Sequence, residues 1–374
     1  MTSRPLRDKI IRLIRESGPI TFERFMEMSL YDPDFGYYTS GTLPVGREGD
    51  FYTSPHLHPV FGRLIGRQIE EMWEQMGRPA DFSIIEMGAG RGYLAFDMLG
   101  YLKGSDIYDA VTYRIVELNP TVQEQQEGIL AEFGDKIAWA RSLSAIREMT
   151  GCLVSNELLD AFPVHLVVME DTLKEIYVTS DGESLREETG PLSTGALTEY
   201  FRELRVAFPS GYRTEANLRI RRWLAEAAAS LREGFILTVD YGYTAREYFS
   251  EDHDRGTLLC YHRHQLTEDP LQHVGEQDIT AHVNFSAVKK WGEEAGLKAI
   301  GYTGQGAFLM SAGIDEEIRS LAATSGDYLF EVAKIKGLIL PQGMGESHMV
   351  MIQYKGEGVP SLRGFSMRNR LRYL

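Results

Sequence analysis

The sequence predicts an α/β protein built on a doubly wound, Rossmann-like sheet. Residues 82–86 form a short apolar run that ends in an acid and passes into a glycine-rich turn, and residues 93–102 follow with the apolar spacing of a helix. From residue 82 onward, short apolar runs alternate with helical patterns, which is typical of a parallel sheet with right-handed crossovers. An N-terminal helical region and an inserted α+β lobe complete the expected architecture.

The bulk composition limits what the chain can be. Its 374 residues exceed one average domain, so we expect a second lobe or large insertions. The net charge of −15 argues against binding to nucleic acid. Two distant cysteines give no disulfide framework, and no run approaches the roughly 18 apolar residues of a membrane span. No signal or transit peptide is evident, so we expect a cytoplasmic protein, whose oligomeric state stays open.

Residues 1–80 are expected to form an N-terminal helical region with a cleft-covering loop. Ile10, Leu13 and Ile14 share one helical face, and Thr21 is placed to cap a second helix. An irregular segment at 49–55 precedes a helix expected over 59–76.

Residues 81–374 are expected to form the main domain, with insertions at about 163–212 and 241–285. Apolar runs predict strands at 82–86, 112–117, 136–138, 152–155 and 235–240. The alternating run 164–177 predicts a hairpin, and a helix is expected over 213–231. After the second insertion, the patterns predict a helix at 286–295, a strand at 297–302, helical structure around 315–334 and a strand at 348–354.

The glycine turn indicates a nucleoside-containing cofactor. Gly88, Gly90 and Gly92 give the spacing G-x-G-x-G, and Tyr93 stands where a dinucleotide fingerprint needs its third glycine. This difference favours S-adenosylmethionine over NAD. Glu86 ends the strand before the turn, and Glu117 ends the next strand, where an acid can bind ribose hydroxyls of either cofactor. The alternatives are a turn that only packs a helix against a strand, and a solvated Glu117.

Polar residues also follow the fourth strand. Glu157 and Asp160 lie three residues apart beside Asn156, and such a carboxylate pair suits a guanidinium or ammonium group. One of the two acids could instead cap the following helix. Asp240, at the end of the fifth strand, could line the same cleft or cap the next segment. The histidine pairs at 56/58 and 262/264 lack further ligands, so no metal site is expected.

Four segments in order resemble the MidA family: Glu86–Gly92, Gly49–Pro55, Asn156–Val164 and Asp240–Gly242. The mitochondrial members of that family are arginine methyltransferases that assist the assembly of respiratory complex I. Further matches at 256–258, 278–285, 305–309 and 340–341 extend the resemblance over nearly the whole chain. Two departures are His56, where the family usually has an acid, and Asn284, where it usually has Asp.

The resemblance implies a class I methyltransferase fold, S-adenosyl-L-methionine as donor and a protein arginine as acceptor, with a respiratory complex I subunit as the implied partner. The implied cofactor-binding residues are Glu86, Gly88, Ala89, Gly90, Glu117, Asp50, Thr53 and Pro55, and the implied catalytic residues are Asn156, Glu157 and Asp160. A non-enzymatic assembly factor, an NAD(P)-dependent reductase and a small-molecule methyltransferase remain as alternatives.

Overall fold

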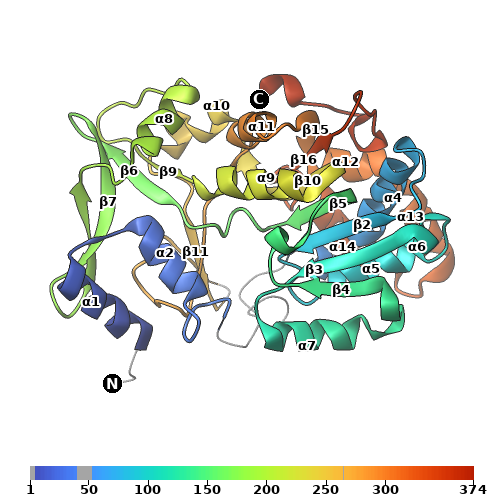
Figure 1. Ribbon diagram of the computed structural model, residues 1–374, viewed down its shortest axis with the longest axis horizontal. Coiled ribbons are helices and arrows are strands. Elements are labelled where there is room, and N and C mark those ends of the chain that lie inside the picture. The colour runs from blue at the N-terminus through green and yellow to red at the C-terminus, as the bar shows by residue number, and fades with distance from the viewer. Residues whose placement is uncertain (1–4, 40–52, 264) are drawn as a thin grey trace. The chain divides into compact units, whose positions relative to one another are not determined.

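The computed structural model describes residues 5–39, 53–263 and 265–374 (Figure 1). These residues belong to two compact units, each assembled from three segments of the chain. The first unit comprises Met1–Phe51, Leu159–Arg222 and Tyr243–Ala287, and the second comprises Tyr52–Leu158, Trp223–Gly242 and Val288–Leu374. Most of both expected insertions falls in the first unit, whereas residues 52–80 group with the second.

The second unit contains the doubly wound sheet, which confirms the predicted fold class. Its strand order is β15-β16-β10-β5-β2-β3-β4. Strands β4, β3, β2, β5 and β10 are parallel. Strand β16 pairs antiparallel with β10, and β15 pairs antiparallel with β16 at the edge of the sheet. The bounds are β2 (Phe82–Met87), β3 (Val111–Val116), β4 (Ile137–Ala140), β5 (Met149–Asn156), β10 (Leu231–Tyr243), β15 (Lys298–Gly304) and β16 (His348–Lys355).

Helices flank this sheet and bury its apolar faces. Phe61 and Ile65 of α4 lie in one buried cluster with Leu94 and Met98 of α5, which follows the glycine turn. The longer helices are α4 (Val60–Gln75), α5 (Tyr93–Leu102), α7 (Pro120–Ile129), α9 (Arg219–Ser230), α11 (Phe285–Glu294), α12 (Gln305–Ala312), α13 (Ile314–Thr324) and α14 (Tyr328–Ile339). The shorter ones are α3 (Ser54–Leu57) and α6 (Ile107–Ala110). The helical stretch expected around 315–334 is thus two helices, separated by Ser325-Gly326-Asp327.

The first unit is built around small antiparallel sheets. The larger has the order β1-β7-β6-β9, with β8 also paired to β7, and the smaller has the order β12-β11-β13. The hairpin predicted over 164–177 is confirmed by β6 and β7. The bounds are β1 (Ile20–Thr21), β6 (His165–Met169), β7 (Leu173–Ser180), β8 (Leu185–Gly190), β9 (Arg213–Ala216), β11 (Leu259–His262), β12 (Gln265–Thr267) and β13 (Asp278–Thr280), with helices α1 (Pro5–Ser17), α2 (Phe22–Tyr31), α8 (Gly195–Glu203) and α10 (Ala245–Tyr248).

The predicted helix over 213–231 was wrong in its first residues. Arg213–Ala216 pair with β6 as strand β9, and α9 begins only at Arg219. Thr214 and Glu215 are each 1% exposed, so tertiary pairing decides their conformation over local helical spacing.

The predicted start of the second helix is confirmed. The Thr21 side chain accepts a hydrogen bond from Arg24 N at 3.2 Å and so caps α2. Ile10, Leu13 and Ile14 all pack into the apolar cluster of the first unit. Among the described residues, no helix has the length and apolar character needed to cross a membrane.

Candidate cofactor and acceptor site

The strand order of the second unit identifies where a ligand would bind. The chain runs from β2 outward through β3 to β4, whereas β5 and β10 extend the sheet on the other side of β2. Order therefore reverses between β2 and β5, and doubly wound sheets bind ligands at the carboxyl ends of the strands at such a point. Met87 of β2 is paired with Ser155 of β5. Gly88 and Asn156, the residues that follow them, consequently lie next to each other at this edge.

The glycine turn leaves room for a ligand beside its backbone. Gly88 and Gly90 have φ values of 76° and 53°, in the left-handed region that favours glycine. A Cβ atom on Gly88 would lie 2.9 Å from Leu158 Cδ1, whereas one on Gly90 would meet no atom within 4 Å. The backbone at Gly90 is therefore open to close approach, while the neighbouring Ala89 is buried in the core.

Glu117 lies half-buried directly after β3 and is held in place by three donors. Its Oε1 accepts from the backbone amides of Leu118 and Asn119, each at 2.8 Å. Gln126 Nε2 approaches Glu117 Oε2 at 3.4 Å and donates to the Gly90 carbonyl at 2.8 Å. Burial raises the pKa of the Glu117 carboxyl above its ordinary value. Gln126, which the sequence did not single out, thus links the acid to the glycine turn.

Glu86 is more buried than the other expected cofactor residues that the structure describes. Its side chain is 2% exposed and accepts a hydrogen bond from Tyr113 of β3, with 2.7 Å between the oxygens. Burial raises the pKa of its carboxyl to about 7. A direct contact between Glu86 and a cofactor stays a prediction.

Glu157 anchors the segment that begins α3. Its φ of 48° is unusual for a residue other than glycine, and its backbone amide donates to Val239 O at 2.8 Å. Its Oε1 accepts from Ser54 N at 3.0 Å and from Asn156 Nδ2 at 3.2 Å, and the side chain is 4% exposed. Among the described residues no hydrogen bond reaches Oε2. One carboxylate oxygen therefore holds the Ser54 segment, and a contact of the other with a ligand stays a prediction.

Asn156 supplies a second acceptor at the same place. The residue is 9% exposed, and its Oδ1 has no hydrogen-bond partner in the part of the chain that the structure describes. A buried acceptor without a partner is costly unless a water or a ligand donor satisfies it. Asn156 Oδ1 therefore fits an ammonium or guanidinium N–H of a ligand.

Asp240 supports this turn. The residue is fully buried, and its carboxylate accepts from Leu158 N at 3.1 Å and Tyr241 N at 2.9 Å. Because Leu158 directly follows Glu157, Asp240 fixes the turn on which Glu157 stands.

The remaining predicted site residues are distributed as follows. Asp160 belongs to the first unit, is 5% exposed, and its carbonyl accepts from Ala281 N at 2.9 Å. Thr53 Oγ1 lies 2.6 Å from His56 Nδ1, and Pro55 occupies the first turn of α3. Asp50 lies outside the described residues.

Comparison with known proteins identifies the family. Residues 64–303, more than half of the chain, match the model of a family described as "Putative S-adenosyl-L-methionine-dependent methyltransferase". The chain belongs to this family. It is therefore an S-adenosyl-L-methionine-dependent methyltransferase. Membership of this family confirms the predicted cofactor.

Relatives and solved structures agree with this assignment. The chain is 30% identical to the mitochondrial protein arginine methyltransferase NDUFAF7 homolog of Drosophila melanogaster, over 86% of this chain and 77% of that protein. It is 28% identical to mitochondrial NDUFAF7 of Rattus norvegicus, over 91% and 82%. A crystal structure of a COG1565 superfamily member from Burkholderia thailandensis bound to S-adenosyl-homocysteine has a TM-score of 0.90 and 30% identity, covering 99% of this chain and 96% of that one. These curated relatives are mitochondrial, and the cytoplasmic location expected for this chain stays a prediction.

The geometry of the second unit fits this cofactor. A Cβ atom on Gly90 would meet no atom within 4 Å, and the Glu117 carboxylate lies directly after β3, where an acid can bind ribose hydroxyls. Their contacts with the cofactor stay predictions. Within the described ranges, no three His, Cys, Asp or Glu side chains are grouped as metal ligands. His58 instead accepts from Val60 N at 3.0 Å and lies 3.0 Å from Glu331.

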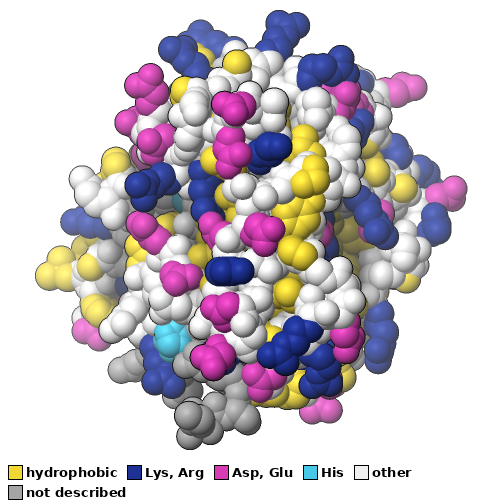
Figure 2. All heavy atoms as spheres, turned by 90° about the vertical axis from the view of Figure 1, so that its left-hand side faces the viewer, with side chains coloured by type: hydrophobic (Ala, Val, Ile, Leu, Met, Phe, Trp, Pro, Cys, Tyr) yellow, Lys and Arg dark blue, Asp and Glu magenta, His cyan; other side chains and the backbone are white. Residues whose placement is uncertain are grey.

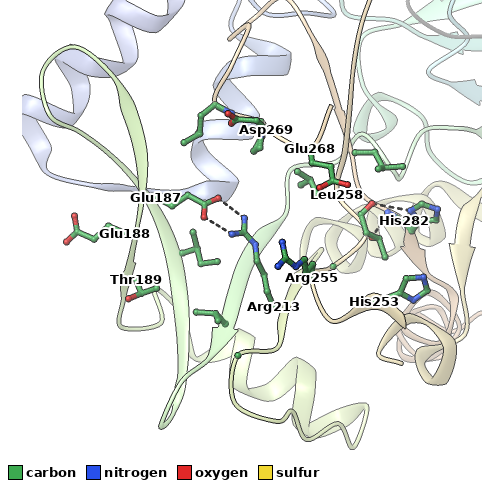
Figure 3. Close-up of a pocket in the computed structure, with 18 of the residues that line it drawn as sticks. Glu187, Glu188, Thr189, Arg213, His253, Arg255, Leu258, Glu268, Asp269 and His282 are labelled. Carbon is green, nitrogen blue, oxygen red and sulfur yellow. Dashed lines mark hydrogen bonds and ion pairs between the residues drawn. The ribbon is translucent and has the colours of Figure 1, made fainter. Parts of the chain in front are cut away.

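The first unit contains a separate cleft of about 860 Å³ (Figure 3). It is lined by the larger sheet, by His253 and by residues 255–259 and 268–271, and it carries five carboxylates and two guanidinium groups. Figure 3 shows Arg213 facing Glu187, and two N–H···O contacts of 2.6 Å join them. Over the face shown in Figure 2, acidic and basic side chains are interspersed. Its acidic residues are Glu170, Glu187, Glu188, Glu268 and Asp269.

Proposed function

We propose that this methyltransferase transfers a methyl group to an arginine nitrogen of a protein. The observation that carries the proposal is the pair of acceptor oxygens at the end of β5, Asn156 Oδ1 and Glu157 Oε2, beside the glycine turn. Two oxygens that both accept hydrogen bonds suit the planar N–H groups of a guanidinium. The names of the Drosophila and rat relatives support the same acceptor.

The chain's own residues would orient the acceptor and remove one proton. When bound, S-adenosylmethionine supplies the sulfonium methyl group. A guanidinium keeps its charge at neutral pH, so its nitrogen must lose a proton as the new N–C bond forms. We assign the orientation to Asn156 Oδ1 and the acceptance of the proton to the Glu157 carboxylate. Asp160 stays a predicted second carboxylate of the acceptor site.

A protein acceptor is favoured over a small molecule by the cleft of the first unit. The carboxylates of Glu170, Glu188 and Glu268 make no ion pair among the described residues. Arginine and lysine side chains could place their aliphatic parts on Val168, Ile176 and Leu258 while their charged ends meet these acids. Because the chain resembles the MidA family, we propose a respiratory complex I subunit as the acceptor.

Transfer can be measured directly with a labelled methyl donor. The protein is incubated with lysate proteins and labelled S-adenosylmethionine, and the labelled proteins are hydrolysed for amino-acid analysis. We expect the label in methylarginine. Label in other residues would refute the arginine acceptor, and cofactor binding with no transfer would favour the non-enzymatic assembly factor.

Glu157→Gln tests the assigned proton acceptor. The amide oxygen can still accept from Ser54 N, but the variant has lost the charge and the basicity of the carboxylate. A charge-assisted hydrogen bond is worth about 1.5–3 kcal/mol, so we expect kcat to fall by roughly 10- to 100-fold with cofactor affinity nearly unchanged. Glu124→Gln, at an exposed position of α7, is the control. Unchanged turnover in Glu157→Gln would refute the role.

A further inference from the structure

A buried histidine lies beside the carboxylate to which the transferred proton is assigned. His348 begins β16 and is fully buried. Its Nε2 lies 3.6 Å from Glu157 Oε1 and makes no hydrogen bond among the described residues. Burying a ring nitrogen without a hydrogen bond costs free energy. Fold stability alone therefore does not explain why this nitrogen lies beside a carboxylate.

The other ring nitrogen leads to the protein surface. His348 Nδ1 lies 3.1 Å from Ser347 Oγ, and Ser347 is exposed. The Tyr241 ring packs on the imidazole, with the ring centres 3.9 Å apart, and fixes its plane. One imidazole therefore bridges a buried carboxylate and a hydroxyl in contact with solvent.

We propose that His348 is a positioning residue that relays the proton from Glu157 to solvent during each turnover. The inference rests on the proposed function, because a methyl acceptor that loses no proton needs no such relay. The acceptor nitrogen forms its bond to the methyl carbon as the carbon–sulfur bond breaks, the sulfur keeps the electron pair, and the nitrogen's proton passes to Glu157. The protonated Glu157 carboxyl group gives a proton to His348 Nε2, and His348 releases the proton on Nδ1 through Ser347 Oγ to water. Proton exchange with water then returns the imidazole to its starting tautomer.

The charges around the imidazole are compatible with this role. Glu157 faces it from the end of β5, and Asp240 and Tyr241 lie on β10, which pairs with β16. Asp240 is occupied by the amides of Leu158 and Tyr241. His56, on α3, interacts electrostatically with Glu157, and burial lowers the pKa of that histidine. Glu157 is therefore the carboxylate that exchanges a proton with His348. Catalytic hydrogen bonds are often long without substrate, and 3.6 Å is within the distance that binding can close.

The kinetic test compares His348→Gln with the wild-type enzyme over pH 5.5–9. A glutamine keeps a polar side chain of similar length but cannot accept and release a proton. We expect kcat to fall by about 10- to 100-fold and the KM of the acceptor protein to stay within twofold. An imidazole that acts as a base makes kcat fall at low pH, and this fall should disappear in the variant. His262→Gln, on β11 of the first unit, is the control. A loss of kcat with an unchanged pH profile would indicate a merely structural residue and overturn the proposal.

A spectroscopic test does not depend on activity. The imidazole ¹⁵N resonances of His348 are compared in the wild type and in Glu157→Gln over the same pH range. We expect them to differ, because the carboxylate faces Nε2. Identical resonances at every pH would overturn the relay even in an active enzyme. A clear difference in a protein that methylates no arginine would refute the proposed acceptor and leave the His348–Glu157 coupling standing.

Discussion

At Gly90, a single added methyl group would enter open space. The residue has a left-handed φ, and its backbone borders the region assigned to the cofactor. Gly90→Ala should therefore weaken the binding of S-adenosylmethionine and S-adenosyl-homocysteine at least tenfold, because the methyl group would occupy the place of the ligand. Titration calorimetry with both ligands and with NADH measures this, and NADH should not bind.

Gly77→Ala is the matched control for that experiment. Gly77 also lies in the second unit with a φ of 80°, and a Cβ there would likewise meet no atom within 4 Å. Both variants carry the same backbone strain of about 1–2 kcal/mol. If both lost affinity equally, strain and not the ligand's position would explain the effect.

Glu86 makes the stability of the protein depend on pH. Its pKa is raised from 4.5 to about 7 by burial, so between these values the folded state binds more protons than the unfolded state. The free energy of unfolding must then fall as pH rises through this window, by about 1 kcal/mol between pH 6 and pH 8. In Glu86→Gln this contribution should be missing. Urea unfolding of both proteins at the two pH values measures it, and equal slopes would contradict the assignment.

At the scale of elements, two glycines in the central strands occupy positions with no room for a side chain. Gly151 of β5 pairs with Ser83 of β2 and with Gly234 of β10. A Cβ on Gly151 would lie 1.9 Å from Ser83 O, and one on Gly234 would lie 2.0 Å from Gly151 O. We expect Gly151→Ala to destabilise the protein by about 3 kcal/mol, because β5 must move away from β2.

Gly100→Ala also adds one methyl group, but at a position where no neighbouring atom is close. Gly100 is an exposed residue within α5, and a Cβ there would meet nothing within 4 Å. Alanine should stabilise this helix by about 0.5–1 kcal/mol. Chemical unfolding of both variants measures the contrast, and similar effects at the two positions would contradict the packing argument.

The strands of the second unit could be predicted from the sequence because each is an apolar run bounded by turns. The expected strand at 82–86 is β2 with one more residue, and that at 348–354 is β16 with one more. The beginning of α9 could not be predicted, because Arg213–Ala216 become a strand only through pairing with β6. Local spacing carries no information on such a partner.

The sequence indicates which residues belong to the candidate site, but it does not indicate which contacts they make. The glycine turn, Glu86 near the end of β2 and Glu117 after β3 follow from strand–turn–helix logic, as does Asn156 at the end of β5. The anchoring of Ser54 by Glu157 joins residues 103 positions apart, and His348 lies 191 positions beyond Glu157. No spacing in the sequence indicates either contact.

At the scale of the whole molecule, the cleft that we propose for binding the acceptor protein lies outside the unit that contains the glycine turn. The cleft acids Glu170, Glu188 and Glu268 lie in the first unit, and the glycine turn lies in the second. Replacing these three acids with lysine should raise the KM of the acceptor protein about tenfold, because each exposed ion pair contributes about 0.2–1 kcal/mol. The affinity for S-adenosyl-homocysteine should not change, and salt should reduce the difference in KM.

Asp8, Glu16 and Glu183 provide the control for that variant. They are exposed acids of the first unit that do not line the cleft, and their replacement with lysine changes the net charge equally. Steady-state kinetics of both triple variants separates a local effect from general charge. Equal KM values would exclude the cleft from acceptor binding.

The interleaving of the two units determines an order of events on the ribosome. The last segment of the first unit ends at Ala287, whereas β16 of the second begins at His348 and pairs with both β10 and β15. At a synthesis rate of about 5–20 residues per second, the nascent chain therefore contains every segment of the first unit several seconds before β16 exists. During that interval β10 can pair with β5, but its opposite edge lacks the partner strand β16. A chaperone that shields an unpaired strand edge would act on this protein during that interval.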